Sequence, residues 1–497
     1  MAKHPSPLFP SFPLHSLSPY IDILTSLFRH MANTTSIMNP LDLPELRRRI
    51  SRFFSVKDAA ACALVSKSWA DDLMSVIWFK IDFDVHPRFA DLSSDIIAKH
   101  GHLIRIVKNA KTPPQVYALA NEGVHSLREL RVETSVSAIQ HEQVYEIIAR
   151  NNPSLEHLYL FARSPTSRNL KSPIHSVMVS ALIPSSSVTR RTSPLKTLRL
   201  KYQHLTHDDL IAILQACPKL YELRLGYTEV VGKPTLPFQH EYLKVLGSSL
   251  DSLFQVPRHG HSLLPYFPSL STLSTFNYVR DSLGPPTTVI KEEISRHCPR
   301  LTGFYLEDGA RTIVPTFITD IASNVEVVCF LYHHLSLKII MAILLHRNTL
   351  RKIKHFNQQT DFDLERDEVG VVMDHFKESG KHLQLIPRCC PALKEFDLPG
   401  HEMDMDEVEV GEWVCKDLKT LRVRIKDLDT KEKILKVIAL WRKGCWRRWQ
   451  EKAGVPVEAV DEQDATDMSI EARVTRHLLK FDKLWRVWLG CQTWSPI

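Results

Sequence analysis

The stretch ACPKLYELRL, residues 216–225, carries the pattern that decides the fold of most of the chain. Leu220, Leu223 and Leu225 follow a proline, and the last two leucines stand two positions apart. Because successive side chains of a strand point to opposite faces, residues two apart lie on the same face. The stretch therefore predicts a short strand with one apolar face, entered through a turn at Pro218.

The same phrase returns along the chain. Close copies are NNPSLEHLYL (151–160), HCPRLTGFYL (297–306) and CCPALKEFDL (389–398). Looser copies are VHSLRELRV (124–132), SPLKTLRL (193–200), FPSLSTL (267–273), RNTLRKI (347–353), CKDLKTLRV (415–423) and KFDKLWRVWL (480–489). The leading leucines Leu195, Leu220 and Leu250 are spaced 25 and 30 residues apart. The sequence therefore predicts tandem units that contribute one strand each.

The residues between these strands predict helices. Thr206 and Asp209 have the spacing of a capping box, which satisfies the free amide groups at the start of a helix. One face of this helix then carries Leu210, Ile213, Leu214 and Cys217. Cys298 and Cys390 stand, like Cys217, one residue before a proline, and we expect all three to be small buried packing residues.

The repeated phrase resembles the leucine-rich repeat. This resemblance covers residues 120–497, with irregular insertions near 163–194, 356–388 and 427–475. It implies an α/β solenoid, a leucine-rich-repeat horseshoe with inner parallel strands and outer helices, whose inner surface holds a protein target. The strand positions expected to face outward are His157, Arg199, Arg224, Tyr305 and Asp397.

A different pattern precedes the repeats, in LDLPELRRRISRFFSVKDAAACALVSKSWADDLMSVIW (41–78). Leu43, Leu46, Ile50, Phe53 and Phe54 recur at intervals of three and four, which predicts one apolar stripe on an amphipathic helix. Ser55 and Asp58 form a capping box for a second helix. A third helix follows residues 66–68. Three helices this short can bury their apolar stripes only against each other or against a partner.

Residues 41–83 resemble the F-box, a module that docks on a Skp-type adaptor and through it on a cullin-RING ubiquitin ligase. The resemblance implies that the adaptor-facing module is shaped by Leu43, Pro44, Leu46, Ile50, Phe54, Leu64, Val65 and Trp69. The family usually carries apolar residues where this chain has Arg47 and Ser51, and a lost anchor would weaken docking roughly 10-fold to 100-fold. Residues 84–119 are expected to connect the two parts, and residues 1–40 to form a disordered leader, with Met1, Met31 and Met38 as candidate starts.

Composition and motifs exclude several other classes of protein. Lys and Arg exceed Asp and Glu by only 7 in 497 residues, a weak excess for a nucleic-acid-binding protein. No stretch is apolar for long enough to cross a membrane. Nine cysteines without C-x-x-C spacing favour a reducing compartment, the cytoplasm or the nucleus. Neither zinc-protease, phosphate-loop nor serine-hydrolase motifs occur, so we expect no enzyme, no catalytic residues, no cofactor and no metal.

The sequence thus predicts a non-catalytic substrate-recognition subunit of an SCF-type ubiquitin ligase, with an unknown protein substrate. The alternative is a leucine-rich-repeat interaction scaffold without ligase association. The stretch ALWRKGCWRRWQEK (439–452) adds a second open question. Its interleaved Trp and Arg residues suit nucleic acid or a membrane surface. A helix that places Leu435, Ile438, Trp441, Cys445 and Trp449 on the last repeats is the interpretation that we favour.

Overall fold

The computed structural model describes residues 43–51, 53–134, 138–162, 181–182, 192–201, 204–226, 228–249, 253, 262–276, 287–306, 318–319, 324–330, 335–355, 380–455 and 468–489. The predicted leader lies outside these residues, as do most of the predicted insertion near 163–194 and residues 356–379 of the next one. The chain divides into two compact units, Met1–Phe79 and Lys80–Ile497. We call the described part of the first the three-helix unit and the second the sheet unit.

The three-helix unit consists of α2 (Pro44–Ser51), α3 (Val56–Ala63) and α4 (Lys67–Ile77). The predicted capping box is present at α3, where the backbone N–H of Asp58 donates to Ser55 Oγ at 3.2 Å. Ser66 caps α4 by accepting from the N–H of Trp69. Both α2 and α3 contact α4, whose Leu73 is fully buried. Short helices are thereby stabilised through mutual burial.

A parallel sheet of 14 strands forms the sheet unit, as far as that unit is described. Its strands are β1 (Lys80–Asp82), β2 (Ile106–Ala110), β3 (Glu129–Thr134), β4 (His157–Ala162), β5 (Thr197–Lys201), β7 (Glu222–Gly226), β9 (Val245–Ser249), β10 (Thr272–Phe276), β11 (Gly303–Leu306), β12 (Val327–Phe330), β13 (Lys352–His355), β14 (Glu395–Met403), β15 (Thr420–Ile425) and β16 (Arg486–Leu489). Each strand pairs with the strands that precede and follow it in this order, and β6 (His204–Thr206) pairs with β8 (Glu229–Val231) in a small second sheet.

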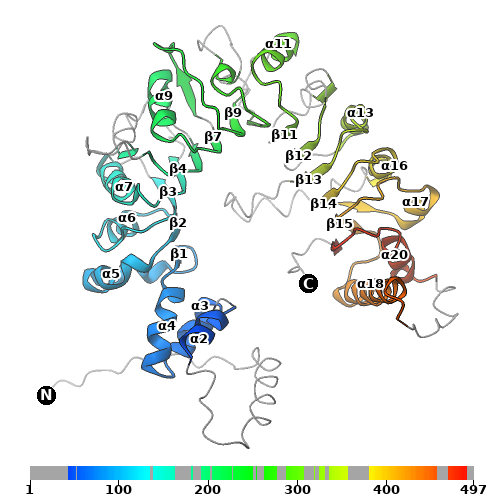
Figure 1. Ribbon diagram of the computed structural model, residues 1–497, viewed down its shortest axis with the longest axis horizontal. Helices are drawn as coiled ribbons and strands as arrows, with labels where there is room; N and C mark the ends of the chain where they lie inside the picture. Colours follow the sequence, from blue (N-terminus) through cyan, green and yellow to red (C-terminus); the bar gives the residue numbers. More distant parts are fainter. Residues whose placement is uncertain are drawn as a thin grey trace, which may run out of the picture. The chain divides into compact units, whose positions relative to one another are not determined.

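Helices follow most of these strands and lie along one face of the sheet (Figure 1). They are α5 (Ser94–His100), α6 (Pro113–Leu119), α7 (Ala138–Asn151), α9 (His207–Ala216), α11 (Thr287–His297), α13 (Leu337–Leu344), α15 (Gly380–Leu383), α16 (Leu385–Cys389), α17 (Met405–Val410), α18 (Lys431–Lys452) and α20 (Ile470–Leu478). Single 3-10 turns stand at η2 (Pro87–Asp91), η3 (Gly101–Leu103) and η4 (Leu264–Tyr266). The architecture is α/β, and the described helices include none with the length and apolar character that a bilayer crossing requires.

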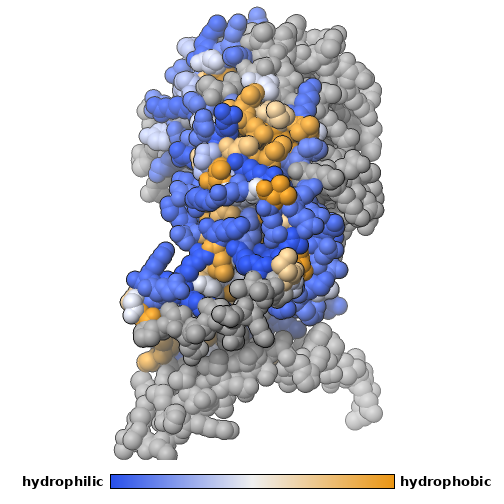
Figure 2. Space-filling model, turned by 90° about the vertical axis from the view of Figure 1, so that its right-hand side faces the viewer, coloured by the Kyte–Doolittle hydropathy of each residue, from blue (hydrophilic) through white to orange (hydrophobic). Residues whose placement is uncertain are grey.

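The core lies between the sheet and these helices. In β7 it contains Leu223 and Leu225, as the repeated phrase predicts, and the leading Leu220 is also fully buried. The helix face predicted over residues 206–217 is confirmed, because Leu210, Leu214 and Cys217 are buried behind a capping box. The described residues on the face seen in Figure 2 are largely hydrophilic, with hydrophobic residues gathered in patches. The leucine face of β7 points to the helices, and Arg224, which stands between Leu223 and Leu225 in the sequence, lies on the opposite face.

Four strands, β1, β2, β9 and β12, lie where the leucine pattern did not place them. Residues 84–119, predicted as a connecting segment, contain β2, and β1 begins the sheet at Lys80. The register of β9 pairs Leu246 with Leu223, so the leading leucine of this unit is Leu243 and not Leu250. Strand β12 was not predicted, because Val325 takes the place of a leading leucine there and is fully buried.

Candidate functional site

The residues predicted to shape the adaptor-facing module divide by exposure. Leu64 and Val65, in the turn between α3 and α4, are 89% and 74% exposed. Leu43 and Pro44, at the start of α2, are also exposed. Half-buried positions are occupied by Leu46, Ile50, Phe54 and Trp69. The first group is available to a partner, and the second group also packs the helices together.

Arg47 and Ser51, the two departures from the F-box pattern, are buried inside the three-helix unit. Arg47 Nε lies 2.6 Å from Asp72 Oδ2 on α4, and both side chains are nearly inaccessible to solvent. Ser51 Oγ donates to the carbonyl of Arg48 at 2.9 Å. Neither position faces outward: Arg47 joins α2 to α4, whereas Ser51 bonds within α2. Asp72 supplies the charge that the buried Arg47 guanidinium needs.

One exposed residue is absent from the predicted set. Phe53 lies beyond the last residue of α2 and is 88% exposed. The three-and-four spacing placed it on the inward stripe, but that spacing holds only while the helix continues, and α2 ends at Ser51. The capping box at Ser55 indicates that a new helix starts at Val56. It is the sequence signal that could have placed Phe53 in the turn between the two helices.

A second candidate surface is the polar face of the sheet. The register aligns Tyr159, Arg199 and Arg224 on three neighbouring strands. Glu222 Oε1 lies 2.9 Å from Arg199 Nη2 and 2.6 Å from Arg224 Nε, so a single carboxylate binds both guanidinium groups. Arg199 also lies over the ring of Tyr159, 5.0 Å from its centroid. The predicted Arg199 and Arg224 are thus brought together, but both are buried within this cluster.

The other predicted face positions lie in the same sheet. Tyr305 is aligned with Cys329 on the next strand, and Arg224 lies 5.8 Å from the Tyr305 ring centroid. Between them in this row stand Gly247, which has no side chain, and Ser274, whose side chain is small. Burial raises the pKa of Asp397, against the opposing effect of Arg422 at 3.8 Å. His157 belongs to the adjacent row, beside Glu129 and Thr197.

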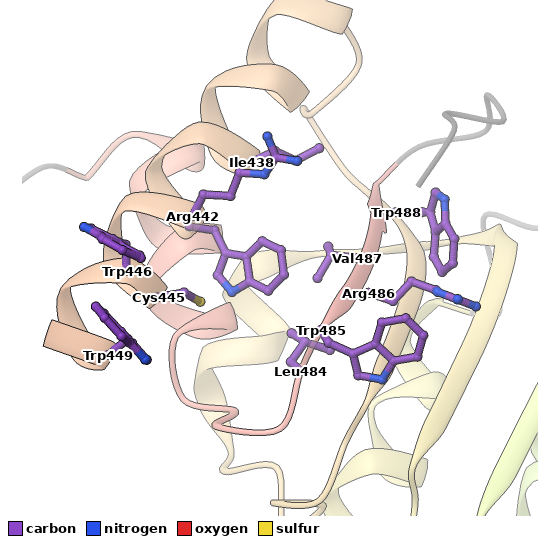
Figure 3. Close-up of a pocket in the computed structure, with 11 residues that line it drawn as sticks. Ile438, Arg442, Cys445, Trp446, Trp449, Leu484, Trp485, Arg486, Val487 and Trp488 are labelled. Carbon is purple, nitrogen blue, oxygen red and sulfur yellow. The ribbon is translucent and has the colours of Figure 1, made fainter. Parts of the chain in front are cut away.

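A third candidate surface is a pocket of about 490 Å³ at the end of the sheet, between α18 and the segment that leads into β16. Five tryptophans line it, together with Arg442 and Arg486 (Figure 3). Helix α18 confirms the predicted helix but not its stripe. Ile434, Val437, Ile438 and Trp441 are buried, whereas Leu435 and Trp449 are exposed. The predicted stripe is therefore confirmed at Ile438 and Trp441 and wrong at Leu435 and Trp449, which are exposed.

The described residues hold no group of three or more His, Cys, Asp or Glu that could bind a metal ion. The three cysteines at the repeat position are buried, as predicted. Burial raises the pKa of the Cys217, Cys298 and Cys390 thiols to about 12. Because the thiolate is the reactive form, these side chains are poor nucleophiles and poor metal ligands. The three surfaces described above are suited to binding.

No model of a known protein family matches the sequence, and no curated protein matches it.

Proposed function

We propose that the chain is a non-catalytic substrate receptor of an SCF-type ubiquitin ligase. In this proposal the three-helix unit is an F-box that docks on a Skp-type adaptor, and the sheet unit is a leucine-rich-repeat solenoid that binds a protein target. The observation that carries the proposal is the exposure of Leu64 and Val65 between two helices of the F-box-like unit. Binding of a partner that covers these aliphatic side chains is favourable, because it removes apolar surface from water.

The sheet unit supports the second half of the proposal. Its parallel strands follow one another in chain order, and its helices lie on one face of the sheet. Stacked repeats of one strand and one helix are expected to have this organisation. The opposite face carries the polar row that includes Arg199, Arg224 and Tyr305. A target held on that face and an adaptor held at the F-box are brought into one complex.

The receptor would contribute proximity to the reaction. It would hold a lysine of the target near a ubiquitin-charged enzyme, which converts a bimolecular encounter into one within a complex. This role requires no catalytic side chain in the receptor. It would be carried out in the cytoplasm or the nucleus, where the ligase components are expected to be present.

The decisive experiment is co-expression of the full chain with a Skp-type adaptor, followed by affinity purification. The variant Leu64→Glu with Val65→Glu should lower adaptor affinity at least 10-fold, because each lost aliphatic contact is worth about 1.5–3 kcal/mol. Both side chains are exposed, so the variant should fold. Val410→Glu, at another exposed valine, is the matched control and should leave affinity unchanged. A wild-type chain that captures no adaptor would favour the scaffold without ligase association.

A further inference from the structure

The pocket beside β16 runs along the edge of a strand. The consecutive residues 484–488 all line it. Three of them, residues 486–488, are consecutive in β16. Because side chains alternate across a strand, a pocket that touches three strand residues in a row must lie beside the strand and not on one of its faces. Helix α18 forms the opposite wall with Cys445, Trp446 and Trp449 (Figure 3). The feature is therefore a groove between a strand and a helix.

The strand on this groove is the last one of the described sheet, and its only described partner is β15. The N–H of Arg486 donates to the carbonyl of Lys419, on the β15 side. Because backbone groups of successive residues point to alternate sides of a strand, the N–H and C=O of Val487 point to the groove. An extended peptide could continue the sheet there through main-chain hydrogen bonds.

The groove combines apolar walls with positive charge. The rings of Trp446 and Trp449 are stacked at a centroid distance of 4.7 Å, and both side chains are more than half exposed. Arg486 lies over the ring of Trp485, 4.1 Å from its centroid. None of the described lining residues is acidic. Helix α18 itself carries eight Lys or Arg residues and two Glu residues. The complementary ligand is acidic and has an apolar or aromatic anchor.

We propose that this groove binds an extended acidic peptide segment of a partner protein, added as a strand beside β16 with an apolar side chain against the tryptophans. The open strand edge favours a peptide over single-stranded nucleic acid, since nucleic acid cannot use the backbone groups of Val487 in a sheet pairing. The proposal does not depend on adaptor docking, because the groove belongs to the sheet unit alone.

The test uses the purified full chain and a fluorescein-labelled probe of seven residues, in which glutamates alternate with leucines around a central phenylalanine. Fluorescence polarisation should show saturable binding that weakens as salt is raised. Trp446→Ala with Trp449→Ala should lower affinity at least 10-fold, and Arg442→Gln should reduce both affinity and its salt dependence. The exposed aromatic Tyr242, which does not line the groove, supplies the control Tyr242→Ala, expected to bind as wild type.

Two further probes separate strand addition from simple charge attraction. The same peptide with an N-methyl group on every residue keeps its charge and anchor but has no backbone N–H to donate along either edge, so it should not bind. A peptide with lysine in place of glutamate should not bind either. Absence of binding by the acidic probe overturns the proposal. Tighter binding of a polyuridine oligonucleotide or of anionic phosphatidylserine vesicles than of the peptide also overturns it. Two other results would do the same: self-association of the chain that is lost in the double tryptophan variant, and peptide binding that appears only after residues 490–497 are removed.

Discussion

Arg47 Nε of α2 and Asp72 Oδ2 of α4 lie 2.6 Å apart inside the three-helix unit. Arg48 also approaches Asp72, at 3.4 Å, but its own side chain is exposed. The Arg47 charge stands where F-box sequences usually have an apolar residue, and it faces the neighbouring helix. The Arg47 charge is thus paired within the unit, while Leu64 and Val65 remain exposed.

This pair gives a first prediction. Arg47→Leu should destabilise the three-helix unit by about 3–5 kcal/mol, because it leaves the Asp72 carboxylate buried without its main partner. Arg47→Leu combined with Asp72→Leu should cost much less, since no buried charge remains. Hydrogen–deuterium exchange of α2 and α4 in the full chain measures both effects. Equal losses of protection in the single and double variants would show that the ion pair is not the cause.

The shared carboxylate of Glu222 gives a second prediction. Glu222→Gln should destabilise the sheet around β5 and β7 by about 3 kcal/mol or more, because the buried Arg199 and Arg224 both lose the charge that they share. Glu156→Gln removes a carboxylate from the more exposed pair with Lys196 and should cost only about 0–1 kcal/mol. Urea unfolding of the two variants side by side makes the comparison. Similar midpoints would contradict the assignment of Glu222 as the shared anchor.

Asn151, at the end of α7, gives a third prediction. Its fully buried amide accepts from the N–H of Leu127 at 2.8 Å and donates to the carbonyls of Val124 and Ile147. Asn151→Leu keeps the branched shape of the side chain but leaves several buried backbone groups without this partner, at about 1–3 kcal/mol for each group. We expect a lower thermal midpoint and faster amide exchange between Val124 and Leu127. Unchanged exchange there would show that the side chain is not what satisfies these groups.

A fourth prediction concerns pH. Burial lowers the pKa of His477 to about 4, with Lys480 as a further cause, and the ring packs on Trp413 at 4.6 Å. The unfolded chain therefore takes up this proton first as pH falls. The contribution of His477 to the free energy of unfolding is therefore fully present above about pH 6.5 and is lost as pH falls from there toward 4. Below pH 4 it does not change further, and the total loss is on the order of 3 kcal/mol. His477→Phe should remove this dependence in urea unfolding at pH 7 and pH 4.5. A variant that keeps the full pH slope would assign it to other groups.

Much of the sheet could be predicted from the sequence because its signal is local. Every copy of the leucine phrase, including RNTLRKI and KFDKLWRVWL, contributes a strand at the expected place. Strand β12 could not be found in this way, since valine replaces leucine at its buried positions. β9 was placed seven residues late, because Leu250 matched the pattern as well as Leu243 did. Sequence spacing does not reveal which of two leucines is covered by the preceding unit.

The candidate surfaces were less predictable for a physical reason. Helical spacing identifies which residues share a stripe, but the side that is covered depends on neighbours distant in sequence. Arg47 was read as a lost contact, and only the position of Asp72, 25 residues later, shows what it binds. The groove beside β16 likewise depends on α18 and Trp485 coming together across residues 453–484, and no local pattern encodes this meeting.

The pairing of each strand with its sequence neighbours has a mechanical consequence. A chain pulled from its C-terminus should lose β16 first and then β15, because each strand of the described sheet pairs only with its neighbours in chain order. Each detachment breaks one ladder and exposes one fresh apolar layer, so resistance to pulling should be spread over many similar small steps. An unfoldase that engages the tail would therefore meet a sequence of modest barriers and could stall or release the chain at any of them.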